Sequence, residues 1–158
     1  MNALVAGFGN VFFNDDGFGP EVARTLAAQT PMPNVRVRDF GTGGMHLALE
    51  MLEAYDLIVL VDAIGRNDEP GTLFVIEPGE STAAASAPDA HAMDVTGVLS
   101  IYERLRRDLE PGRAPKILIA GCVPADTGEG MTLSEPVRAA VPGCVDLVRG
   151  LLERNSHG

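Results

Sequence analysis

Residues 56–77 read DLIVLVDAIGRNDEPGTLFVIE and contain two strands joined by a short link. Residues 57–61 are apolar without alternation, which is typical of a strand buried on both faces at the centre of a sheet. Residues 71–77 form a second apolar segment that begins with a glycine. Only residues 65–70 separate the two, whereas a parallel crossover needs about a dozen residues or more. The second strand of this pair is therefore expected to run antiparallel.

Strands and helices alternate along the chain on both sides of this pair. The parallel part begins at the amino-terminal end, where the alternation predicts right-handed crossovers and places the first strand between the second and the third. The whole chain has 158 residues, which indicates a single α/β domain over residues 1–158. We expect strands at residues 3–7, 35–40, 56–64, 71–77 and 116–123, and helices at residues 20–29, 45–55, 91–109 and 134–154, the last interrupted at Pro142-Gly143.

The chain is acidic, with 12 Lys and Arg residues against 22 Asp and Glu residues and a net charge of −10. Such a surface repels phosphate groups, so we expect neither a nucleic acid nor an anionic membrane as a partner. The two cysteines, Cys122 and Cys144, lack the spacing of a zinc finger or a disulfide framework. Cys122 is expected to be a small buried side chain. No signal peptide or membrane-spanning run is evident, which favours a cytoplasmic protein.

The segment after the first strand, residues 7–19, reads GFGNVFFNDDGFG. It stands where a dinucleotide-binding fingerprint would, but Phe12 occupies the place of the third glycine. Asp15 and Asp16 would also oppose a pyrophosphate at the start of the helix, so nucleotide binding is not expected. Capping of that helix would explain one of the two carboxylates. The other is then a candidate for chemistry.

Three side chains are expected to meet where the first and third strands end. Asp16 precedes the first helix and Asp62 ends the third strand, so the strand order brings both to the crevice where open α/β sheets bind ligands. His91 begins the long helix that the chain reaches on returning to this end. Two carboxylates and an imidazole suit a divalent ion such as Ni²⁺ or Zn²⁺. Asp62 as a cap and His91 as a surface residue are the simpler alternatives, and whether Asp15 or His46 joins the site stays open.

Phenylalanines are concentrated around the same segment, at Phe8, Phe12, Phe13 and Phe18. They could pack beneath the loop or form an exposed apolar patch that docks a protein partner. Of these residues, we expect Phe18 to be exposed for docking and Phe12 to be buried.

Several motifs together resemble those of the maturation endopeptidases of nickel–iron hydrogenases. They occur in the same order over essentially the whole chain, which is far more specific than any one motif. The matching segments are Gly7-x-Gly9-Asn10, Asp15-Asp16-Gly17-x-Gly19, Asp39-x-Gly41-Thr42-x-Gly44, Val61-Asp62-Ala63, Pro70-Gly71-Thr72, His91 and Gly121-x-x-Pro124.

The resemblance implies a three-layer α/β/α sandwich around a mixed five-stranded sheet whose fourth strand is antiparallel. It implies an endopeptidase that removes a short C-terminal extension from the hydrogenase large-subunit precursor after nickel has been inserted. The nickel would be carried by that precursor, and its contacts would map to Asp16, Asp62 and His91. Asp16 and Asp62 would also be the catalytic carboxylates.

Two other functions share some of these features. An escort protein that binds the nickel-loaded large subunit without cleaving it would use the same three ligands, and shortening of the precursor would distinguish the two. A peptidyl-tRNA hydrolase also begins with a Gly-x-Gly-Asn turn. That activity needs a basic face for tRNA, however, and this chain carries a net charge of −10.

Overall fold

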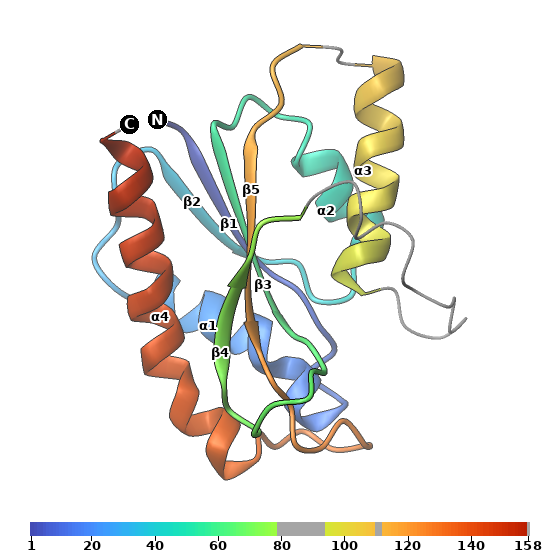
Figure 1. The fold of residues 1–158 in the computed structure, drawn as a ribbon, viewed down its shortest axis with the longest axis vertical. Coiled ribbons are helices and arrows are strands. Elements are labelled where there is room, and N and C mark those ends of the chain that lie inside the picture. Colours follow the sequence, from blue (N-terminus) through green and yellow to red (C-terminus); the bar gives the residue numbers. More distant parts are fainter. Residues whose placement is uncertain (79–93, 110–111, 158) are drawn as a thin grey trace.

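The computed structural model describes residues 1–78, 94–109 and 112–157. A five-stranded sheet runs through the centre in the order β2-β1-β3-β5-β4 (Figure 1). No helix in the described ranges is long and apolar enough to cross a membrane. The elements in chain order are β1 (Ala3–Gly7), the 3-10 helix η1 (Asn14–Gly17), α1 (Phe18–Ala27), β2 (Val35–Asp39), α2 (Gly44–Glu50), β3 (Leu57–Ala63), β4 (Leu73–Ile76), α3 (Val95–Leu109), β5 (Lys116–Cys122) and α4 (Glu135–Ser156).

The antiparallel strand predicted from the short link is β4. It pairs with β5, from Leu73 opposite Cys122 to Ile76 opposite Ile119, whereas β1, β2, β3 and β5 run parallel. β5 lies between β3 and β4, so the link passes over the end of β5. The backbone N–H of Ile64 donates to the Cys122 carbonyl there, at 2.9 Å. The predicted order of the first three strands and the antiparallel direction of the fourth are both confirmed.

Helices cover both faces of the sheet and make three layers (Figure 1). Successive side chains of a strand point to opposite faces. Val59 and Val61 of β3 accordingly belong to the core under α1 and α4, while Ile58 and Leu60 belong to the core under α2 and α3. Both sets are fully buried, with at most 1% of their surface exposed. The prediction of a central strand that is apolar on both faces is confirmed, and so is the α/β/α sandwich.

α1 begins and ends two residues earlier than predicted, and α4 and α2 differ from the predictions in larger ways. α4 is continuous through Pro142, although Pro142 has no N–H to give to the preceding turn and such a residue costs a helix about 3 kcal/mol. The helix is maintained because its buried stripe, which includes Val141, Cys144 and Val145, packs against the sheet on both sides of the proline. α2 ends at Glu50 instead of extending to residue 55, because tight turns follow, with the N–H of Glu53 donating to the Glu50 carbonyl.

A glycine at position 19 lets the start of α1 lie directly against the sheet. A Cβ at Gly19 would overlap the carbonyl oxygens of Val61 and Phe8. Val61 lies near the end of β3 and Phe8 directly follows β1, and the Phe8 N–H donates to the Val61 carbonyl at 3.0 Å. The close approach therefore fixes η1, which immediately precedes α1, beside the carboxyl ends of the two central strands.

We predict that Gly19→Ala lowers the free energy of unfolding by about 3 kcal/mol, because the added methyl group meets backbone atoms that cannot rotate away. Gly65→Ala is the matched control, since a Cβ at Gly65 meets nothing within 4 Å. Urea denaturation of both variants measures the difference. Equal stabilities for the two variants would contradict the close approach of α1.

Candidate functional site

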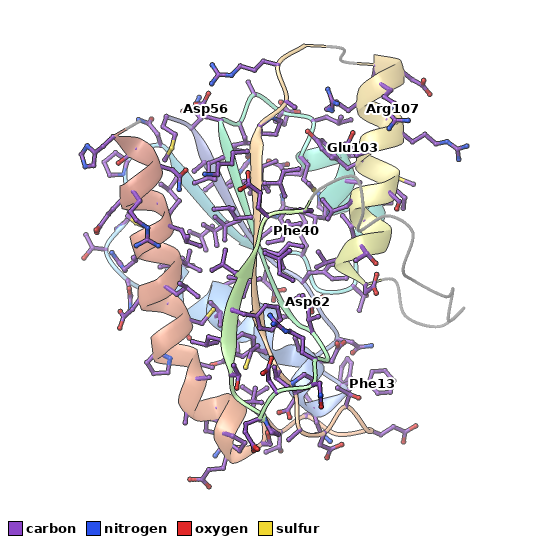
Figure 2. All side chains as sticks on the ribbon, viewed as in Figure 1. Phe13, Phe40, Asp56, Asp62, Glu103 and Arg107 are labelled. Atoms are coloured by element: carbon purple, nitrogen blue, oxygen red, sulfur yellow. The ribbon has the colours of Figure 1, made fainter. Side chains whose placement is uncertain are left out.

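Asp16 and Asp62 lie at the carboxyl ends of the central strands, as the strand order predicts. Asp62 is the next-to-last residue of β3 and is only 4% exposed (Figure 2). One oxygen of its carboxylate accepts the N–H of Ala63 at 2.8 Å. Asp16 lies in η1 and is half-buried, and its Oδ2 accepts the N–H of Asn10 at 2.7 Å. The backbone therefore orients both carboxylates.

The two carboxylates act on each other electrostatically. Burial raises the pKa of Asp62 well above its ordinary value, and the charge of Asp16 raises it further. Burial also raises the pKa of Asp16, against the opposing effect of the hydrogen bond from Asn10. Like charges in a poorly solvated site disfavour each other's ionised form. The doubly ionised form of the pair is therefore unfavourable.

The start of α3 also lies near the Asp62 carboxylate. The charge of Asp94 raises the pKa of Asp62, whereas the backbone N–H of Val95, the first residue of α3, lowers it. Asp94 itself caps the helix, since its Oδ1 accepts the N–H of Gly97 at 3.0 Å and the hydroxyl of Thr96 at 2.5 Å. The described part of α3 thus approaches Asp62.

His91 lies outside the described residues, so its predicted place beside Asp62 stays a prediction. Within the described ranges, no group of three or more His, Cys, Asp or Glu side chains is arranged to hold a metal ion. Asp16 and Asp62 offer oxygen ligands only. A divalent ion bound there needs at least one more donor from elsewhere, either from this chain or from a bound partner.

Asp15 has a different role from its neighbour Asp16. It is 0% exposed, and its carboxylate accepts four hydrogen bonds, from the N–H groups of Ala125, Asp126 and Ser134 and from the Ser134 hydroxyl. Burial opposes its ionisation, but these hydrogen bonds prevail and lower the pKa of Asp15. Asp15 therefore ties η1 to the loop after β5. Helix capping, the alternative considered for this pair, is absent, because the start of α1 has no side-chain cap.

His46 and Cys122 are two further candidates from the sequence. His46 is exposed on α2, with its ring edge-on to Phe40 at a centroid distance of 5.4 Å. Cys122 is fully buried, as predicted, and burial followed by the charge of Asp15 raises the pKa of its thiol to about 11. A thiol with so high a pKa is a poor nucleophile at neutral pH.

The expectations for Phe12 and Phe18 are both wrong. Phe18 is 0% exposed and packs in the core under α1 and α4, because the first turn of α1 points it at the sheet. Phe12 is 60% exposed and Phe13 is 40% exposed, and both precede η1. Figure 2 shows Phe13 at the edge of the molecule. Met131, which follows the residue bridged to Phe13, is 72% exposed. Any apolar docking surface here consists of these three side chains and not of Phe18.

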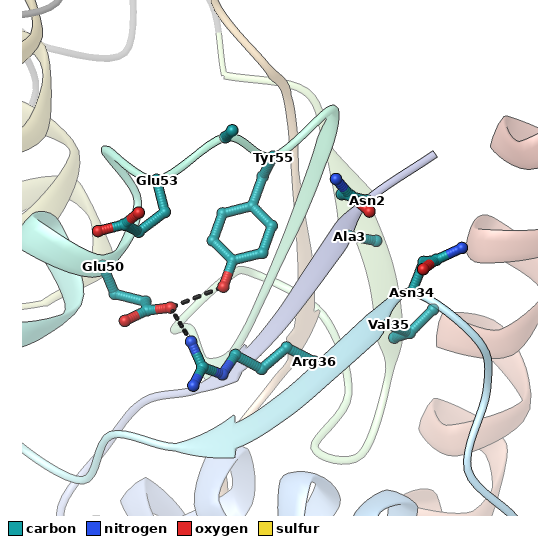
Figure 3. Close-up of a pocket in the computed structure, with 9 residues that line it drawn as sticks. Asn2, Ala3, Asn34, Val35, Arg36, Glu50, Glu53 and Tyr55 are labelled. Atoms are coloured by element: carbon teal, nitrogen blue, oxygen red, sulfur yellow. Dashed lines mark hydrogen bonds and ion pairs between the residues drawn. The ribbon is translucent and has the colours of Figure 1, made fainter.

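Two cavities lie away from the carboxylates. One of about 430 Å³ lies at the amino-terminal ends of β1 and β2, where Glu50 accepts hydrogen bonds from Arg36 at 2.7 Å and from Tyr55 at 2.6 Å (Figure 3). The other, of about 940 Å³, lies between α3 and the start of β5. Neither is lined by Asp16 or Asp62. Arg36, Glu50 and Tyr55 thus satisfy one another, which gives these three side chains a structural role.

We predict that Asp15→Asn destabilises the protein by about 2 kcal/mol, because an amide NH₂ would face one of the four donors now satisfied by the carboxylate. Asp16→Asn, the adjacent control, should leave stability unchanged or slightly raise it.

The folded-state pKa of Asp15 is lowered. Its contribution is therefore present above the unfolded value near 3.8 and is lost as the pH falls through the folded pKa. Thermal unfolding from pH 7 to pH 2 tests both statements, and a stability loss in Asp16→Asn alone would contradict them.

Comparison with known proteins identifies the family. The family model described as hydrogenase maturation protease matches residues 20–150. The coenzyme F420 hydrogenase subunit delta of Methanothermobacter thermautotrophicus is 31% identical over 154 residues, which cover 92% of this chain and 90% of that protein.

Solved structures agree with the sequence comparisons. The hydrogenase 2 maturation peptidase of a Thaumarchaeota archaeon is 28% identical, with a TM-score of 0.72 over 97% of this chain and 99% of its own. The maturating endopeptidase HybD of Escherichia coli, at 24% identity, has the same fold, with a TM-score of 0.80 over 98% of this chain and 94% of its own. The chain described here is an endopeptidase and belongs to the hydrogenase maturation protease family.

Proposed function

We propose that this endopeptidase removes the C-terminal extension of a nickel-loaded hydrogenase large-subunit precursor in the cytoplasm, and that it recognises the nickel carried by that substrate. Asp16, Asp62 and His91 would contact the metal. The observation that carries the proposal is the buried, mutually repelling pair of carboxylates at the switch point of the sheet. Such a pair is unfavourable unless it binds a proton or a cation.

The pair can act as a checkpoint because its charge is uncompensated in the free enzyme. A metal ion brought by the precursor would favour ionisation of both carboxylates and would displace the proton that the raised pKa of Asp62 retains. A precursor without nickel brings no such charge, so nothing displaces the proton from Asp62. Binding of the precursor would therefore depend on prior insertion of the metal.

Two hydrolytic routes are open to this arrangement. In one, a carboxylate takes a proton from water, the water oxygen attacks the carbonyl carbon, and the proton passes to the leaving amide nitrogen. In the other, the metal in the substrate polarises the carbonyl while a carboxylate activates the water. Asp16 and Asp62 are the candidate bases in both routes.

The first prediction concerns the substrate. Incubation with nickel-loaded precursor should yield a shortened large subunit, whereas nickel-free precursor should remain at full length. Intact-protein mass spectrometry distinguishes the two products. Equal cleavage of both precursors would overturn the checkpoint, and binding of the nickel-loaded precursor without shortening would favour an escort function instead.

The second prediction concerns the site residues. Asp16→Asn, Asp62→Asn and His91→Ala should each abolish processing or reduce it at least about a hundredfold, the usual contribution of a general base. Asp146→Asn, an exposed aspartate on α4, is the control and should retain full activity. Circular dichroism checks that each variant folds, and full activity in any of the three would remove that residue from the site.

Asp62→Asn should also be more stable than the wild type at neutral pH. The folded-state pKa of Asp62 is raised, so the ionised carboxylate destabilises the folded state above the unfolded value near 3.8. An amide removes this penalty, and the gain should shrink as the pH falls towards that value. Thermal unfolding of the metal-free protein at pH 7 and pH 4 measures it. A lower melting temperature at pH 7 would contradict the uncompensated charge at Asp62.

A further inference from the structure

Asp62 belongs to a row of three paired positions across the sheet. Asp62 of β3 lies opposite Gly121 of β5, and Gly121 lies opposite Phe74 of β4. Side chains at paired positions point to the same face of a sheet. Asp62 and Phe74 therefore project on the α3 side, with a glycine between them. Strands are spaced by about 4.8 Å, so the two side chains begin roughly 10 Å apart.

The glycine lets the aromatic ring approach the carboxylate. A Cβ at Gly121 would overlap the far end of the Phe74 ring, which shows that the ring leans from β4 across β5. The direction of this lean is towards β3 and Asp62. Phe74 is half-buried and forms an apolar wall on the β4 side of the carboxylate pair.

Arg66 lies on the outer face of this wall. It follows Asp62 by four residues on the link to β4, and its guanidinium carbon is 4.2 Å from the centroid of the Phe74 ring. Its Nε is 3.3 Å from Oδ2 of Asp68, and its side chain is 43% exposed. Among the described residues, Asp68 is its one ion-pair partner, so the two terminal amino groups have no carboxylate partner there.

We propose that Arg66 is a substrate-positioning residue of this peptidase, binding a carbonyl or carboxylate oxygen of the precursor chain next to the cleaved bond. This inference rests on the proposed cleavage site at Asp16 and Asp62. The carboxylates at Asp16, Asp62 and Asp94 repel acceptor oxygens, whereas Arg66 presents donors to them at the same end of the sheet. A planar guanidinium binds such oxygens through two parallel N–H groups.

Stacking on Phe74 prepares Arg66 for this role. A long side chain normally loses conformational freedom when it binds, and a guanidinium already held on a ring loses less. The stack also sets the height of the guanidinium above the sheet, because the ring rests over Gly121. The glycine, the ring and the arginine thus form one arrangement at the end of the sheet where Asp62 lies.

Steady-state cleavage of nickel-loaded precursor tests the proposal in Arg66→Ala, Arg66→Lys and Phe74→Leu. Arg66→Ala should raise KM about tenfold and change kcat less than twofold, because an interaction lost equally from the ground and transition states alters KM alone. Arg66→Lys should raise KM as Arg66→Ala does, since an ammonium group does not stack on a ring or donate two parallel hydrogen bonds as a guanidinium does. Phe74→Leu should raise KM in the same direction. Arg36→Ala, which loses an ion pair at the opposite end of the sheet, is the control and should leave KM unchanged.

The assay separates this inference from the proposed function. If the wild type cleaves the precursor and Arg66→Ala has an unchanged KM, the role of Arg66 is wrong while the proposed function stands. An equal KM increase in Arg36→Ala, or recovery of the wild-type KM in Arg66→Lys, would also overturn the role. If the wild type does not shorten the precursor, the proposed function itself fails. Repetition at low and high salt identifies the oxygen, because a carboxylate contact weakens with salt more than a carbonyl contact does.

Discussion

The repulsion between the carboxylates of Asp16 and Asp62 is the constraint that the surrounding structure has to overcome. Burial and the charge of Asp16 together keep the pKa of Asp62 high, so the pair destabilises the empty site. The fold holds the two together nonetheless. β3 fixes Asp62 at its end, and the close contact of Gly19 with the Val61 carbonyl fixes η1 beside it. A site that is unfavourable when empty is suited to a substrate that brings its own cation.

The adjacent residues Asp15 and Asp16 have different roles in this site. Asp15 is fully buried and saturated with hydrogen bonds, which lower its pKa, whereas Asp16 has one such bond and a raised pKa. The first anchors η1 to the loop before α4, and the second is left for chemistry. The difference arises from which donors each carboxylate reaches, and a one-residue step along η1 is enough to change them.

The sequence predicts much of the backbone, because chain connectivity and hydrophobic pattern are local. Residues 57–61 identify the central strand, the short link fixes the direction of β4, and the strand order brings Asp16 and Asp62 to one crevice. Features that depend on side-chain direction were not predictable. Phe12 points outward from the loop before η1, whereas Phe18 points inward from the first turn of α1. The position of the Phe74 ring over Gly121 depends on the register between β4 and β5, which are distant in sequence. α4 also continues through Pro142, because its packing outweighs the local penalty.

The most direct test of the account is the titration of the Asp62 carboxyl group, followed by carbon-13 NMR in the metal-free wild type and in Asp16→Asn. We predict a pKa for Asp62 well above 3.8 in the wild type, and a lower one in Asp16→Asn, where the neighbouring charge is gone. An ordinary pKa in the wild type would contradict the account, as would a raised pKa that Asp16→Asn leaves unchanged.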